Sequence, residues 1–164
     1  IAWAMSVPGV GRVRIFPQAL GANTVEVCLV DPNMEPAGSE VIQAVQALID
    51  PNKNGDGSGE APIGAVCTVT TAERLEIAVS ASVTIAEEAE LGAVTEAVKA
   101  NLTDYLREIA FAKGVSYVSY AQITSRINAT EGVLDHKDLT VNGGTSNVPL
   151  EDRQTPVLGE VHLT

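Results

Sequence analysis

The feature that most constrains the fold is a long alternation of apolar and other residues between Leu75 and Ile85. Every second residue of this segment is apolar, and the intervening positions include Glu76, Ser80 and Ser82. Successive side chains of a strand point to opposite faces, so a period of two predicts a strand with one buried face. We therefore expect a long strand here, with its polar residues pointing outward.

The segment that follows this strand changes to helical spacing. Apolar residues recur every three or four positions from Leu91 to Ile109, which predicts an amphipathic helix continuing to Lys113. A second helix is expected over residues 120–129, and strands are expected over 133–141 and 156–163. These elements predict a domain at residues 73–164 with the order β-α-α-β-β.

The first part of the chain predicts a smaller unit of the same kind. Alternating runs at residues 10–16 and 24–31 indicate a hairpin, and helical spacing continues from Val41 to Ile49. A glycine-rich loop follows, and then a strand over 65–70. We expect a β-β-α-β domain at residues 1–72, with the domain boundary near residues 71–74.

A short glycine–valine phrase occurs in both parts. Gly9-Val10 and Gly132-Val133 each precede a predicted strand, and a predicted helix precedes the second phrase. Before the first phrase there is only Ile1–Met5, which resembles the last turn of a helix. These patterns predict the α+β fold class, as two related sheet-plus-helix domains with antiparallel or mixed sheets, of which the first is truncated at its N-terminus.

Composition narrows the classes of partner. The formal net charge is −11, which argues against nucleic-acid binding because phosphate neutralisation needs a basic surface. No apolar run approaches the roughly 18 residues of a membrane-spanning helix, and no basic stretch resembles a signal peptide. Cys28 and Cys67 lie within apolar strand-like runs, where buried free thiols are expected rather than a disulfide.

The sharpest local motif is a candidate calcium loop with oxygen-bearing side chains at Asp50, Asn52, Asn54 and Asp56. Alternating short side chains of this kind aim oxygens inward, as the first half of a calcium loop requires. The second half does not match, since position twelve is Ala61 instead of a bidentate glutamate. The weak match leaves two interpretations open, a plain mobile loop and a half-formed calcium site.

Residues for catalysis are not evident. The serines lack a Gly-x-Ser-x-Gly frame, and no glycine-rich phosphate-binding motif precedes a helix. His136 and His162 lie near carboxylates in the sequence, but nothing in their spacing indicates a metal site. We expect no cofactor and no enzymatic activity of this segment.

The order of these glycine-punctuated runs resembles the baseplate J-like family of contractile-tailed phages and related injection systems. The resemblance covers nearly the whole chain and rests on five phrases in order: Pro8-Gly9-Val10 with Val13-Arg14-Ile15, Gly21 to Val27 with Val30-Asp31, Ala61 to Ala65 with Val69, the strand Ile77–Val83, and Glu131 to Asp135 with Val157 to Val161. Two features depart from it, a long acidic loop at 52–60 and the Ala22-Asn23 turn.

The resemblance implies a structural wedge component of a tail baseplate, arranged around the tail hub in a ring with sixfold symmetry. Its partners would be other baseplate or tail proteins and copies of itself, with no nucleic acid and no membrane. Its location would be the virion, and the host bacterial cytoplasm during assembly. Two alternatives remain at this point: a surface binding or adhesion module supported by calcium at the Asp50 loop, and a hydrolase whose active residues lie elsewhere.

Overall fold

The computed structural model describes all 164 residues, which divide into two compact units, Ile1–Arg74 and Leu75–Thr164. Each unit has its own hydrophobic core. Both combine helices with mixed sheets, so the predicted α+β class is confirmed.

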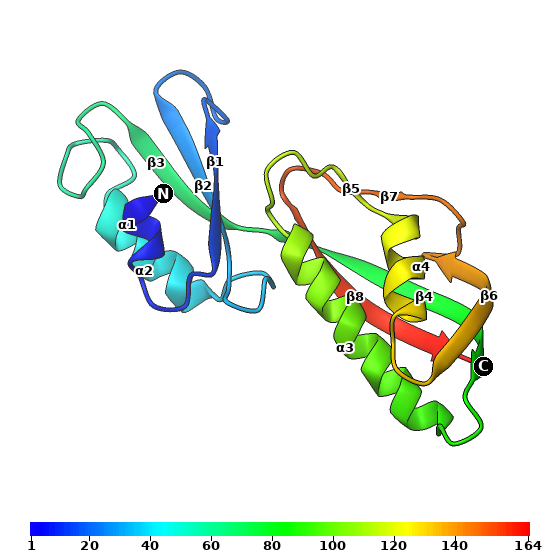
Figure 1. The fold of residues 1–164 in the computed structure, drawn as a ribbon. Coiled ribbons are helices and arrows are strands. Elements are labelled where there is room, and N and C mark those ends of the chain that lie inside the picture. The colour runs from blue at the N-terminus through cyan, green and yellow to red at the C-terminus, as the bar shows by residue number, and fades with distance from the viewer. The chain divides into compact units, whose positions relative to one another are not determined.

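The first unit is a three-stranded sheet with a helix on one face (Figure 1). Its strand order is β1-β2-β3, where β1 pairs antiparallel with β2, and β2 pairs parallel with β3. A parallel pair needs a crossover connection, which α2 provides. The elements are α1 (Ala2–Met5), β1 (Arg12–Pro17), β2 (Thr24–Val30), α2 (Ser39–Ile49) and β3 (Val66–Thr71).

The core of this unit lies between the sheet and α2. Val27 and Leu29 alternate along the central strand, and both are buried against Val45 and Ile49 of α2. Val45 and Ile49 are four residues apart, so the 3.6-residue period of the helix places both on the face that packs on the sheet. The same alternation places Val69 of β3 in this core.

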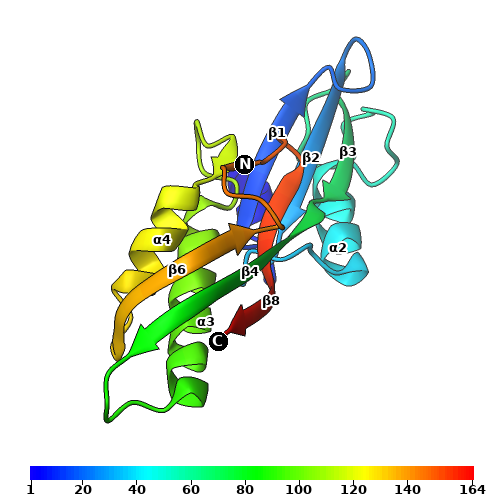
Figure 2. The same ribbon diagram turned by 90° about the vertical axis from the view of Figure 1, so that its right-hand side faces the viewer.

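The second unit is a three-stranded sheet with two helices (Figure 2). A small two-stranded ribbon is added to it. Its sheet order is β6-β4-β8, and the ribbon pairs β5 with β7. The elements are β4 (Glu73–Ile85), α3 (Leu91–Ile109), β5 (Tyr117–Val118), α4 (Tyr120–Asn128), β6 (Val133–Val141), β7 (Val148–Pro149) and β8 (Gln154–Leu163).

The central strand β4 pairs with an antiparallel strand, β6, on one side and with a parallel strand, β8, on the other. It runs antiparallel to β6, with register irregularities between Ser80 and Ser82 and between Thr84 and Ile85. On the other side, Thr164 donates its N–H to Ala81 O and accepts from Val83 N, the pattern of a parallel pair, in which one residue bonds two alternate residues of its neighbour.

The alternation predicted between Leu75 and Ile85 is confirmed. Ile77, Val79 and Ala81 are buried in one core with Val98 and other residues of α3, whereas the residues between them are exposed. No helix combines the length and the apolarity that a bilayer-spanning segment needs.

Several element ends differ from the sequence expectations by one to four residues, and the two-residue strands β5 and β7 were not expected. Two of the differences have a clear local cause. Strand β1 begins at Arg12, because Val10 is part of a turn in which its N–H bonds Val7 O and Gly9 takes a φ of 94°. Helix α3 ends at Ile109 instead of Lys113, since Phe111 adopts a left-handed φ of 54° that an α-helix cannot contain.

Candidate functional site

The candidate calcium loop is organised around the carboxylate of Asp50, the residue that caps the C-terminus of α2 and is only 2% exposed. Its Oδ2 accepts hydrogen bonds from Gly55 N at 3.2 Å and Cys67 N at 3.0 Å, and its Oδ1 accepts from Asn54 N at 3.3 Å. A metal ligand needs oxygen lone pairs that face the ion, but these are directed at backbone donors. The Asp50 carboxylate therefore holds the loop against strand β3 through these hydrogen bonds, without a metal ion.

The other predicted ligands bond to one another on the loop surface. Asn52 Nδ2 donates to Asp56 Oδ2 at 2.9 Å, and Asp56 N donates to Asn54 Oδ1 at 3.1 Å. Hydrogen bonds from Ser58 and Asn52 hold the pKa of Asp56 well below its usual range. The structure thus brings the four predicted residues into one loop but gives them partners within the chain. No group of three or more His, Cys, Asp or Glu side chains is arranged to hold a metal ion.

Gln46 is a buried polar residue that the sequence analysis missed. Its Nε2 donates to Asp50 O at 2.6 Å and to Cys67 O at 2.9 Å, and its Oε1 accepts from Val69 N at 2.8 Å. Gln46 and Asp50 are four residues apart, and together they satisfy the backbone of β3 where α2 packs on it. The signal in the sequence was a polar residue next to Val45 on the apolar face of a helix.

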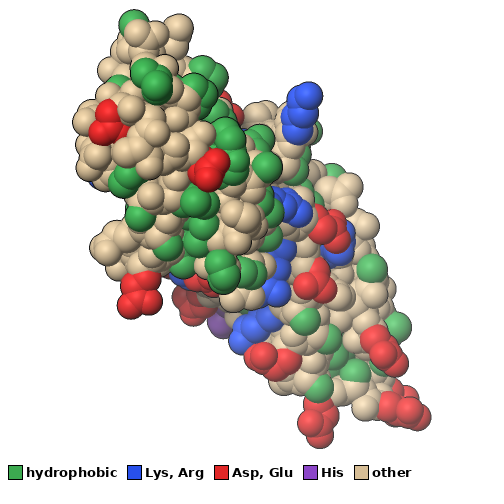
Figure 3. Space-filling model, turned by 90° about the vertical axis from the view of Figure 1, so that its left-hand side faces the viewer, with side chains coloured by type: hydrophobic (Ala, Val, Ile, Leu, Met, Phe, Trp, Pro, Cys, Tyr) green, Lys and Arg blue, Asp and Glu red, His purple; other side chains and the backbone are tan.

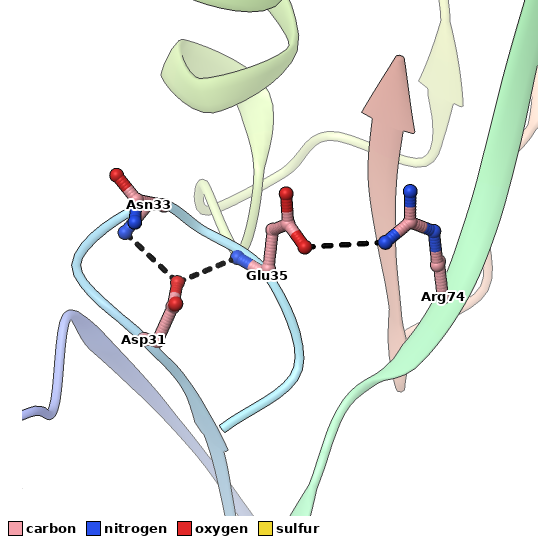
Figure 4. A network of polar contacts seen from close by, with 4 residues as sticks. All are labelled: Asp31, Asn33, Glu35 and Arg74. Atoms are coloured by element: carbon pink, nitrogen blue, oxygen red, sulfur yellow. Dashed lines mark hydrogen bonds and ion pairs between the residues drawn. The ribbon is translucent and has the colours of Figure 1, made fainter. Parts of the chain in front are cut away.

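A second polar network shapes the turn between β2 and α2 (Figure 4). Asp31 Oδ1 accepts from Asn33 N at 2.8 Å and Glu35 N at 2.9 Å, and Glu35 pairs with Arg74 at 3.1 Å. The side chains of this ion pair are 43% and 45% exposed, so its contribution to stability is small. The network fixes the turn and links it to the residue that ends the first unit.

The two histidines are not brought together. His136 lies on β6, where its Nδ1 is 2.7 Å from Asn128 Oδ1, and His162 lies on β8 at the other edge of the sheet. The two cysteines are buried and free, as predicted. Burial, together with the Asp50 charge, raises the pKa of the Cys67 thiol.

The remaining surface features are exposed apolar side chains and two open hollows. Leu20 and Ile63 are 67% and 84% exposed at the end of the first sheet where β2 and β3 begin, beside an open hollow of about 450 Å³. A larger open hollow, of about 670 Å³, lies in the second unit at the start of α3. Acidic side chains are dispersed over the face in Figure 3, so net charge alone marks no single site.

Comparison with protein-family models decides what this pair of units is. The Baseplate J-like central domain matches residues 1–71, and the Baseplate J-like protein C-terminal domain matches residues 77–164. The chain belongs to the Baseplate J-like family. The resemblance seen in the sequence is thereby confirmed.

Two curated relatives come from Bacillus subtilis (strain 168). The phage-like element PBSX protein XkdT and the uncharacterized protein YqbT are each 34% identical to this Baseplate J-like chain over 161 residues. The match covers 98% of the chain and 45% of each relative, so the chain spans less than half the length of these proteins.

A solved structure shares the fold. A chain in the cryo-EM structure of the anti-feeding prophage (AFP) baseplate, 6-fold symmetrised, superposes with a TM-score of 0.64 at 12% identity. The superposition covers 96% of this Baseplate J-like chain and 35% of the other. At this identity the likeness shows the fold alone.

Proposed function

We propose that this chain is a two-domain assembly module of a structural protein in a contractile phage or prophage tail baseplate. The observation that carries the proposal is the succession of family domains, in which a central domain at residues 1–71 is followed by a C-terminal domain at 77–164. Domains of one structural family that cover a chain in this order support the same role for it.

The surface chemistry supports action by contact and not by catalysis. The hollow at the start of α3 and the exposed apolar residues Leu20 and Ile63 offer surface for such contacts. The proposed partners are other baseplate components and copies of the same protein. Nucleic acid and membrane are not proposed as partners, since the net charge of −11 repels phosphate groups. The protein would reside in the tail of the virion after assembly in the host cytoplasm.

Deletion of the gene in the producing strain tests this function. After induction of the phage or prophage, tails would be purified, imaged by electron microscopy and analysed by mass spectrometry. We expect the full-length protein in the baseplate fraction, no complete tails in the deletion strain, and recovery on complementation. Complete, contractile tails that lack the protein would contradict the proposal.

A further inference from the structure

We infer that the hollow of the second unit, here called the α3 groove, binds a basic segment of a neighbouring baseplate protein. The groove is lined by Ala86, Glu88, Ala89, Glu90, Ala93, Val94, Ala97, Glu131 and Gly132. The inference rests on the proposed function, because that function supplies the neighbours.

The floor of the groove is apolar and shallow, and its residues are small. Ala93 and Ala97 are contributed by the first two turns of α3, and Ala86 and Ala89 by the loop that precedes the helix. Small side chains leave about 670 Å³ of open space, enough for several side chains of a partner. Ala86 N donates to Gly132 O at 2.9 Å, which ties the loop to the turn before β6. The groove is therefore preformed by local structure.

Its rim is negatively charged. The carboxylates of Glu88, Glu90 and Glu131 are exposed, and none of them has an ion pair or hydrogen bond within the chain. Lys99, a later residue of α3, is already paired with Glu96 at 2.7 Å. Like charges around one apolar floor repel each other, and a cation from a partner relieves that repulsion.

An apolar floor with an acidic rim favours one kind of binding partner. A segment that carries Lys or Arg beside small or aliphatic residues would bury its apolar part on the alanines and place its cations at the carboxylates. A second copy of this chain is disfavoured, since each copy carries a net charge of −11. A neutral apolar helix would leave three carboxylates unpaired at the edge of the contact.

Site-specific photo-crosslinking in assembled tails tests the inference. The full-length protein would carry Ala93→p-benzoylphenylalanine, with Asp104→p-benzoylphenylalanine as a matched position, exposed on the same helix but outside the groove. We expect position 93, and not position 104, to crosslink to a neighbour at a segment containing Lys or Arg. The crosslinked peptides would be identified by mass spectrometry.

A charge-neutral variant tests the rim itself. Glu88→Gln, Glu90→Gln and Glu131→Gln combined with the position-93 crosslinker should lower the crosslink yield about fivefold or more, because three charge pairs are lost. The matched control, Glu60→Gln, Asp104→Asn and Glu151→Gln, neutralises the same number of exposed acids elsewhere and should stay within about twofold. Glutamine preserves side-chain size, and circular dichroism melts of both variants check the fold.

The outcomes separate the two proposals. A tail that contains the protein but gives no crosslink from position 93, or a crosslink to a segment without basic residues or to a second copy, would overturn the inference and leave the function intact. Equal loss for both triple variants would also overturn it, because it would show an effect of net charge alone. Complete tails without the protein would refute the proposed function and this inference with it.

Discussion

Replacement of Asp50 by alanine is expected to destabilise the first unit by about 2 to 6 kcal/mol. The substitution removes the acceptor of three backbone donors, two of which, Gly55 N–H and Cys67 N–H, belong to buried residues. Each buried donor left without an acceptor costs about 1 to 3 kcal/mol, and two of them give the range. The third donor, Asn54 N–H, belongs to an exposed residue and can bond water instead.

Urea denaturation measures this change. Trp3 is the only tryptophan and belongs to the first unit, so its fluorescence reports unfolding there, while far-UV circular dichroism reports both units. With a denaturant slope of about 2 kcal/mol per molar, a loss of about 4 kcal/mol lowers the midpoint by roughly 2 M. Asp50→Asn should fall between wild type and Asp50→Ala, because its amide oxygen retains one acceptor site.

Asp56→Ala is the matched control, since Asp56 lies in the same loop but is exposed. Its urea midpoint should stay close to that of the wild type. If Asp50→Ala shifted the free energy of unfolding by less than about 1 kcal/mol, the argument from unsatisfied buried donors would be refuted. An equal effect of Asp56→Ala would show that loop composition, and not the Asp50 carboxylate, stabilises the unit.

Three further outcomes are expected. Millimolar calcium should leave the melting temperature unchanged, because the oxygens of the Asp50 loop already have partners in the chain; a clear rise in a calcium titration, absent with magnesium, would instead support the calcium-site interpretation. Cys28 and Cys67 should react with a thiol reagent only after unfolding, since both are buried and the raised pKa of Cys67 lowers its thiolate fraction at any given pH; fast reaction of the native protein would contradict this. Arg74→Ala should cost no more than about 0.5 kcal/mol by urea denaturation, as its ion pair with Glu35 is exposed.

The candidate loop shows where sequence patterns stop being informative. Alternating oxygen side chains at Asp50 and Asp56 resemble both a metal site and a loop that satisfies its own backbone. The contact that favours the second interpretation, donated by Cys67 N–H to the Asp50 carboxylate, joins residues 17 positions apart and exists only once α2 packs on β3. The role of Gln46 could not be predicted for the same reason. Its acceptor, Cys67 O, lies 21 residues away in the sequence, and its donor, Val69 N–H, lies 23 residues away.

The groove on the second unit could not be predicted from the sequence. Ala93 and Ala97 read as ordinary helix formers, and Glu131 belongs to a turn more than 30 residues later. Only the antiparallel return of β6 beside β4 brings that turn to the start of α3. The surface is thus a product of strand pairing and not of any local motif.

The sequence by itself determined the alternating strands, the amphipathic helices and the family, because hydrophobic periodicity and glycine turns are local properties of the chain. The tertiary structure alone decided which strand pairs are parallel and which antiparallel, the partners of Asp50 and Gln46, and the groove between Ala86 and Glu131. These depend on hydrogen bonds and packing between segments distant in sequence, and no local pattern specifies which segments will meet.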